Sequence, residues 1–133
     1  MTIELKVKTE AHTQLLDITA TVEKAVAESG FRSGVCTVFV PHTTAAVTIN
    51  ENADPDVVRD LIMGLGRLVP WEDGYRHAEG NSAAHLKAGL IGASEQIIVE
   101  NGRLVLGVWQ GIYLCEFDGP RQRRVWLKLT GDG

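Results

Sequence analysis

The spacing of apolar and polar residues along the chain predicts about three helices and a larger number of strands. Strict alternation, as in Ile3, Leu5 and Val7, is typical of a half-buried strand, whereas apolar residues three or four apart indicate one face of a helix. By this criterion strands are expected over residues 2–8, 14–18, 34–40, 45–49, 96–100, 103–106, 112–117 and 125–129. Helices are expected over residues 19–29, 54–66 and 83–91.

The first two predicted helices are bounded by residues that suit helix ends. Asp17 or Thr19 can cap the first helix, and Gly30 can adopt the left-handed conformation that ends it. Asp54 offers a carboxylate cap to the second helix, and Pro55 fits its first position because proline has no N–H to leave unpaired. Both helices are therefore predicted from capping as well as from spacing.

The connections between the predicted elements indicate the fold class. Residues 70–82 form a long polar loop, after which Asn81 or Ser82 is expected to cap the third helix. Asn101 and Gly102 separate two apolar runs and predict a tight hairpin, because both turn positions need a positive φ. We expect the first two strands to form an edge hairpin and the last strands an antiparallel meander. This order is not regular βαβ alternation, so it favours an α+β fold.

Length and charge limit the kinds of protein that the chain can be. With 133 residues, of which 44% are hydrophobic, it is expected to form a single domain over residues 1–133. A net charge of -4 argues against a protein that coats nucleic acid or an anionic membrane, since both need a broad basic surface. We therefore expect neither as a partner.

The chain has no pattern of a membrane or secreted protein. No apolar run approaches the ~20 residues of a membrane span, and the N-terminus lacks a basic segment followed by an apolar one. Cys36 and Cys115 lie between apolar neighbours within predicted strands, which is typical of buried, reduced thiols. The cytoplasm is the expected compartment.

Three of the four histidines lie in polar, turned segments beside apolar elements, and they are candidate metal ligands. Neutral imidazole is a common zinc ligand, and His42, His77 and His85 could supply the three protein ligands of a catalytic site. Their spacing matches no stereotyped zinc motif, so solvated or hydrogen-bonded loop histidines are the alternative interpretation. His12 lies in a polar stretch and is expected to be an ordinary surface residue.

Two short segments have groups suited to phosphate oxygens. Thr43 and Thr44 offer hydroxyls directly after a strand, and Gly80, Asn81 and Ser82 place backbone N–H groups at a helix N-terminus. The alternative is structural, because threonines also satisfy turns and Asn or Ser also caps helices. Both interpretations stay open from the residues alone.

Charged residues gather beside the same turns. Arg121, Arg123 and Arg124 cluster in an otherwise acidic chain, where they form either a solvated charge run or a bidentate phosphate site. A nearby carboxylate can act as a general base, orient a histidine or hold magnesium with the substrate. The candidate carboxylates are Glu51, Glu79, Glu116 and Asp118. One of them is expected to pair with an arginine instead.

Four segments together resemble the YjbQ-like family, also called the secondary thiamine-phosphate synthase family. They are PHTTAA (41–46), NENADP (50–55), HAEGNSAAHLK (77–87) and GVWQGIYLCEFDGPR (107–121). The resemblance covers nearly the whole chain. It implies an α+β fold that contains a β-sandwich of mostly antiparallel strands, a homotrimer, and a polar pocket around His42, His77 and His85. It also implies a weak thiamine-phosphate synthase activity, which joins a pyrimidine diphosphate to a thiazole phosphate and releases diphosphate.

These features predict a small metal-dependent enzyme that acts on a phosphorylated metabolite. Zinc is the expected ion, and magnesium could accompany a diphosphate substrate. The catalytic candidates are Glu51, Glu79 and Glu116, and the phosphate-binding candidates are Thr43, Thr44, Gly80, Asn81, Ser82, Arg121 and Arg123. One alternative is a non-catalytic module that binds a phosphorylated ligand. Another is metal-assisted hydrolysis of an unphosphorylated substrate, which needs the histidines but not the arginines.

Overall fold

The computed structural model describes residues 1–131, which form eight strands and three helices. In chain order the elements are β1 (Thr2–Lys8), β2 (Gln14–Asp17), α1 (Thr19–Ser29), β3 (Gly34–Phe39), β4 (Ala45–Glu51), α2 (Pro55–Leu68), α3 (Ser82–Ile91), β5 (Ser94–Glu100), β6 (Arg103–Leu104), β7 (Gln110–Glu116) and β8 (Gln122–Gly131). The expected α+β class with three helices is confirmed.

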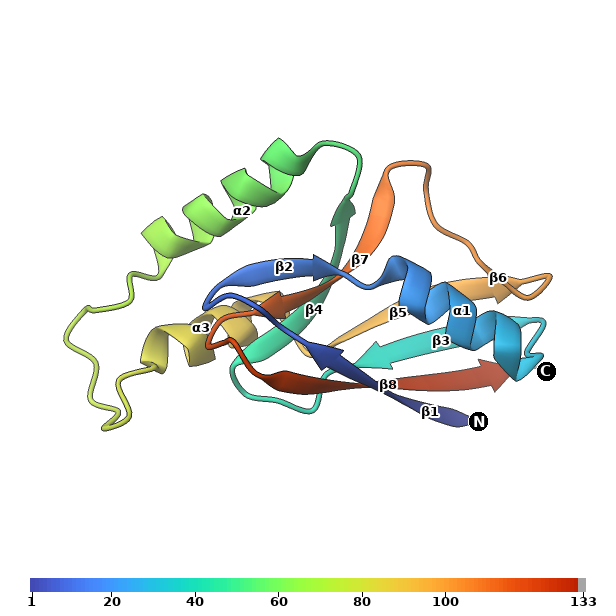
Figure 1. The fold of residues 1–133 in the computed structure, drawn as a ribbon, viewed down its shortest axis with the longest axis horizontal. Helices are drawn as coiled ribbons and strands as arrows, with labels where there is room; N and C mark the ends of the chain where they lie inside the picture. The colour runs from blue at the N-terminus through green and yellow to red at the C-terminus, as the bar shows by residue number, and fades with distance from the viewer. Residues whose placement is uncertain (132–133) are drawn as a thin grey trace.

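The strands form two antiparallel sheets that pack on each other (Figure 1). The five-stranded sheet has the order β1-β8-β3-β5-β6, and the three-stranded sheet has the order β2-β7-β4. Helices α2 and α3 lie on the side of the three-stranded sheet that faces away from the five-stranded one. The chain thus forms the expected sandwich with a helical layer on one side.

Strand β7 lies between two apolar cores. Ile112 and Leu114 face the five-stranded sheet and α1, whereas Tyr113 and Cys115 face α2 and α3. Because successive side chains of a strand point to opposite faces, both sets are buried at once. Residues 111–116 are all buried for this reason, and a strand that is buried on both faces does not alternate between apolar and polar residues.

Two predicted connections are wrong. β1 pairs with β8 and β2 pairs with β7, so the first two strands form no hairpin, and β7 and β8 belong to different sheets rather than to one meander. The short links after β1 and after β7 instead carry the chain from one sheet to the other. They run side by side, since Thr9 N–H donates to Arg121 O at 2.9 Å and Gly119 N–H donates to His12 O at 3.0 Å.

Asp54 caps α2 as expected, since its carboxylate accepts from the N–H of Asp56 at 2.9 Å, whereas the N-cap residues of α1 and α3 make no side-chain cap. Asp17 Oδ1 accepts from the N–H of Thr19 at 2.9 Å, and Gly30 is left-handed with φ 76°. The turn between β5 and β6 has positive φ at both positions, 54° at Asn101 and 73° at Gly102, as the hairpin requires. Helix α2 continues two residues beyond the expected end at Gly66. No helix among residues 1–131 is long and apolar enough to cross a membrane.

Both cysteines are buried, as expected. Burial raises the pKa of Cys36 to about 11 and that of Cys115 to about 12, because an apolar interior disfavours the thiolate. Neither thiol is therefore a nucleophile at neutral pH.

A candidate phosphate-binding pocket

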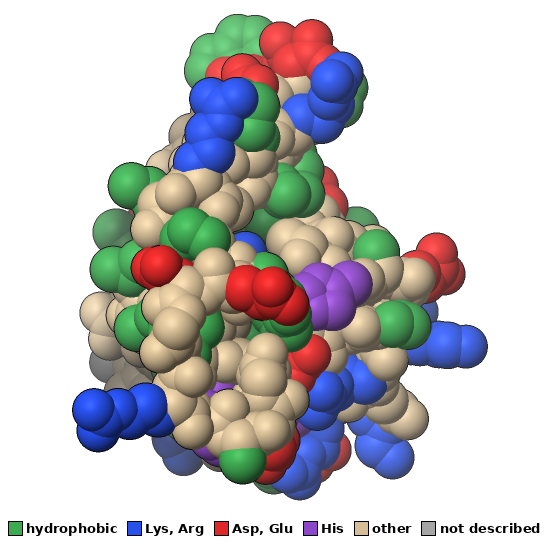
Figure 2. Space-filling view, turned by 90° about the vertical axis from the view of Figure 1, so that its left-hand side faces the viewer, with side chains coloured by type: hydrophobic (Ala, Val, Ile, Leu, Met, Phe, Trp, Pro, Cys, Tyr) green, Lys and Arg blue, Asp and Glu red, His purple; other side chains and the backbone are tan. Residues whose placement is uncertain are grey.

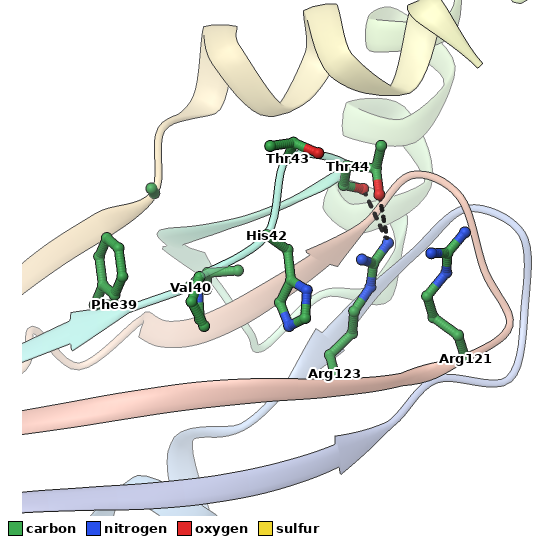
Figure 3. A pocket seen from close by; sticks show the side chains of 9 residues that line it. Phe39, Val40, His42, Thr43, Thr44, Arg121 and Arg123 are labelled. Carbon is green, nitrogen blue, oxygen red and sulfur yellow. Dashed lines mark hydrogen bonds between the residues drawn. The ribbon is translucent and has the colours of Figure 1, made fainter. Parts of the chain in front are cut away.

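A pocket of about 480 Å³ opens beside the turn that follows β3 (Figure 3). Its lining residues are Phe39, Val40, Pro41, His42, Thr43, Thr44, Ala93, Arg121 and Arg123. The last backbone hydrogen bond at this end of β3 is donated by Val40 N–H to Ala93 O at 2.8 Å. The strand stops there because the next residue, Pro41, has no N–H to donate. The turn thereby brings a histidine and two threonines next to the arginines of β8 and of the loop before it.

A second pocket of about 380 Å³ adjoins the first. It shares His42, Thr43 and Ala93 with the first pocket and extends to His85 on α3. The turn over residues 41–44 therefore separates two open spaces, one on the side of the arginines and one on the side of α3. One ligand group can therefore bind on each side of this turn.

His42 lines both pockets with a neutral imidazole ring. Its Nε2 accepts from the backbone N–H of Arg124 at 2.9 Å. Burial lowers the pKa of His42, and the nearby charge of Arg123 lowers it further, so the ring is neutral at pH 7. A neutral ring whose Nε2 accepts a hydrogen bond has its proton on Nδ1. That Nδ1–H group can donate to an anionic ligand.

Arg123 is buried and paired through Nε and Nη2, while its Nη1 group makes no hydrogen bond among residues 1–131 and the side chain lines the pocket, so its predicted role in phosphate binding stays a prediction. Its side chain is 2% exposed; Nε donates to Glu116 Oε1 at 2.8 Å, and Nη2 donates to Glu116 Oε2. Nη2 also donates to Thr44 Oγ1 at 2.9 Å and to Thr44 O at 3.2 Å. The guanidinium therefore joins the turn at Thr44 to strand β7, and the Thr44 hydroxyl is engaged with it.

Glu116 is the other half of this buried pair, which corrects its predicted role as a general base. Its oxygens also accept from Thr9 Oγ1 at 2.8 Å and from the N–H of Asp118 at 3.0 Å. Burial pushes the pKa of Glu116 up, but these hydrogen bonds and the Arg123 charge together hold it below its ordinary value. A carboxylate that stays ionised and accepts several hydrogen bonds is a poor proton acceptor. The structural role of Thr9 had no signal in the sequence.

Arg121 is the more exposed of the two arginines that line the pocket. Its side chain is 49% exposed; Nε donates to Asp118 O at 2.9 Å, and Nη2 donates to Asp118 Oδ2 at 3.1 Å. These two bonds orient the guanidinium and leave its Nη1 N–H groups without a partner among residues 1–131. Arg121, His42 and Thr43 thus bring three kinds of donor to one pocket.

The segment at the start of α3 does not reach this pocket, which corrects the second group of predicted phosphate ligands. Asn81 occupies the N-cap position but makes no side-chain cap; its Nδ2 donates to Asp118 Oδ2 at 2.9 Å. The N–H of Gly80 donates to His77 O at 3.1 Å, within the preceding turn. Gly80, Asn81 and Ser82 are absent from the pocket lining, and Asn81 meets Arg121 only through the shared Asp118 carboxylate.

The three candidate metal ligands do not form one group within this chain. The rings of His77 and His85 lie edge to face with centroids 5.3 Å apart, and His85 shares a pocket with His42. His42 has no free lone pair, because Nε2 accepts from Arg124 and Nδ1 is protonated. Among residues 1–131 no three histidine, cysteine, aspartate or glutamate side chains are arranged to hold a metal ion. A three-histidine zinc site does not fit this arrangement.

The other two catalytic candidates lie elsewhere. Glu51 ends β4, where its carbonyl accepts from Tyr113 OH at 2.9 Å, and Glu79 is an exposed residue of the loop before α3. Neither lines the pocket of Arg121 or the adjoining one. His12 is a half-exposed surface residue, as expected, and its ring packs edge-on against Trp71.

The chain is similar to known proteins over nearly its whole length. The family model described as UPF0047 protein YjbQ-like matches residues 3–132. The chain is 52% identical to UPF0047 protein YugU of Bacillus subtilis, covering 96% of this chain and 97% of that protein. It is 57% identical to a crystal structure of an uncharacterized YjbQ/UPF0047 protein from Clostridium acetobutylicum, with TM-score 0.93 and coverage of 96% and 99%. A YbjQ-like protein of unknown function from Sulfolobus solfataricus has TM-score 0.94 at 34% identity, with coverage of 99% and 97%.

Proposed function

Since this chain belongs to the UPF0047 family of YjbQ-like proteins, we propose that it is an enzyme that binds a phosphorylated metabolite in the pocket of His42, Thr43 and Arg121. The observation that carries the proposal is that an oriented, half-exposed guanidinium lines the same pocket as an imidazole N–H and a hydroxyl. All three donate hydrogen bonds, and guanidinium matches phosphate geometry. Such donors also stabilise negative charge on a departing diphosphate.

The two adjoining pockets support a group transfer over simple storage of one ligand. A reaction of the thiamine-phosphate synthase kind needs two substrates side by side, and the pockets of about 480 and 380 Å³ meet at His42 and Thr43. We propose this transfer as a secondary activity of the site. A non-catalytic binding module would need only one of the two spaces.

A screen of phosphorylated metabolites tests the proposal. A ligand that binds the native state raises its melting temperature, so the screen first measures thermal stabilisation and then turnover of each hit. The pyrimidine diphosphate and thiazole phosphate pair is included. Stabilisation with turnover supports an enzyme, and stabilisation without turnover supports the binding module. If unphosphorylated analogues stabilise the protein as well as their phosphorylated forms, the phosphate site is wrong.

We also propose that the protein binds a divalent ion, as the sequence suggests. Zinc is the expected ion, and His77 and His85 are the pair of imidazoles close enough to share it. We expect His85→Ala to lose most of the zinc that the purified protein binds, measured by metal analysis after equilibration with zinc. His12→Ala, which removes a surface histidine, is the control. Equal zinc content in both variants would contradict the proposal.

We also propose that the protein is a homotrimer assembled through the outer face of the five-stranded sheet. Val35 faces Ile98 and Phe39 faces Trp126 across neighbouring strands, and all four side chains are exposed or half-buried. An apolar patch of this kind is typical of an interface. Light scattering at micromolar concentration should give three subunits, and Ile98→Lys should shift the protein toward monomers. A wild-type monomer would refute the assembly, and unchanged trimers of Ile98→Lys would refute the interface.

A further inference from the structure

Lys87 is a largely buried lysine that lines a pocket. It lies on α3 and is only 6% exposed, yet its Nζ makes no hydrogen bond or ion pair among residues 1–131. The ring of Phe117 lies beneath the ammonium, with its centroid 5.8 Å from Nζ. Burial lowers the pKa of Lys87, because partial desolvation disfavours the charged ammonium.

The side chain of Lys87 lines a third pocket, which is separate from the one described above. This pocket measures about 640 Å³ and is lined by His12, Thr13, Gly66, Trp71, Lys87 and Asp118. It shares no lining residue with the pocket of Arg121. Figure 2 shows the end of the molecule where α2 and the loop before α3 project, and where histidine, acidic and basic side chains lie close together.

A comparison with Arg123 indicates what Lys87 lacks. Both are basic side chains with less than a tenth of their surface exposed, but Arg123 is paired with Glu116 and Thr44. A buried charge without hydrogen bonds is strongly unfavourable, so unpaired examples are rare. Asp118 is the one carboxylate of the pocket, and it is held by Arg121 and Asn81 and lies beyond ion-pair distance of Lys87. The Lys87 ammonium thus has no counter-charge among residues 1–131 and is open to an anion that enters the pocket.

We propose that Lys87 binds the phosphate or carboxylate of a small aromatic ligand whose ring packs against Trp71. The indole is partly exposed, and the His12 ring holds it edge-on with centroids 4.6 Å apart. Aromatic rings prefer such stacked and edge-on contacts, and they bury a large area against a ligand ring. Thr13 adds a hydroxyl to the same wall. Asp118 repels an anion, so the negative group of the ligand lies on the side of Lys87.

Phenyl phosphate and benzoate are suitable probes, and benzyl alcohol is the uncharged control. We expect both anions to shift the indole N–H signal of Trp71 in a nuclear magnetic resonance titration, with the signal assigned from the Trp71→Phe variant. Benzyl alcohol should shift it far less. Lys87→Met, which keeps the length of the side chain and removes the charge, should weaken anion binding about tenfold or more. Lys24→Met removes an exposed lysine of α1 and should leave the binding unchanged.

The melting temperature without ligand separates a binding role from a structural one. Replacing an unpaired buried charge with an apolar side chain is neutral or stabilising, so Lys87→Met should melt at the same temperature as the wild type or higher. A lower melting temperature would show that Lys87 supports the fold and would overturn the proposal. It is equally overturned if phenyl phosphate and benzoate leave the Trp71 signal unmoved, or if they bind Lys87→Met as tightly as the wild type. The Trp71 signal reports this pocket, so these outcomes are independent of the metabolite screen.

Discussion

Arg123→Met is expected to lower the free energy of unfolding by about 3–5 kcal/mol, measured by urea denaturation. The substitution leaves the Glu116 carboxylate buried without its counter-charge, although Thr9 and the backbone of Asp118 still donate to it. It also frees the turn at Thr44, which Arg123 ties to β7. The loss is large because one charge stays buried, and not because the pair itself contributes that much stability.

Two control variants isolate the cause. Arg124→Met removes the neighbouring arginine of β8, which is exposed, and should change stability by no more than about 0.5 kcal/mol. The double variant Arg123→Met with Glu116→Leu removes both charges and should recover most of the loss. If Arg123→Met costs no more than Arg124→Met, water reaches the pair and the network is not the buried link described above.

The same pair sets how acid acts on the protein. The pKa of Glu116 is lower in the folded chain than its ordinary value of 4.5, so the folded state favours the ionised form. The stability that this difference contributes is complete above the unfolded pKa and is lost as the pH falls through the folded one. The double variant should therefore lose less stability than the wild type as the pH falls below about 4.5.

Arg121→Ala is expected to weaken the binding of a phosphorylated ligand found in the screen by about 1.5–3 kcal/mol, or roughly 10- to 150-fold in Kd. The guanidinium is already oriented by Asp118, so it can donate to a phosphate at little entropic cost. Isothermal titration with the phosphorylated ligand and with its unphosphorylated analogue measures the difference. The analogue should be affected little.

Arg124→Ala is the matched control for this measurement. It removes the same charge three residues away, from a side chain that does not line the pocket, and keeps the backbone N–H that holds His42. Its effect on the phosphorylated ligand should be small. Equal losses for both ligands in Arg121→Ala would show that Arg121 supports the fold or the trimer, and the phosphate proposal would lose its main electrostatic support.

Patterns within a few residues determined the elements of this protein. The helix at Thr19–Ser29 was predicted residue for residue, because its apolar spacing, the Asp17 carboxylate and the left-handed Gly30 are all local. The hairpin at Asn101 and Gly102 followed from two positions that favour positive φ. Motifs spread along the chain also indicated the family, and the family model that matches residues 3–132 confirms it.

Contacts between distant segments decided the sheets and the roles of the charged residues. The apolar faces of β1 and β2 suit either sheet, and pairing with β8 and β7 depends on long-range packing that alternation cannot encode. Arg123 and Arg124 are equivalent in a charge count, yet Arg123 points into the core and Arg124 toward solvent because successive residues of a strand alternate. Arg121 lies in the loop before β8, where its side chain stays half-exposed. His42 became a donor rather than a metal ligand through the backbone N–H of Arg124, 82 residues away. Lys87 became an unpaired cation because, within residues 1–131, no acidic side chain forms an ion pair with it.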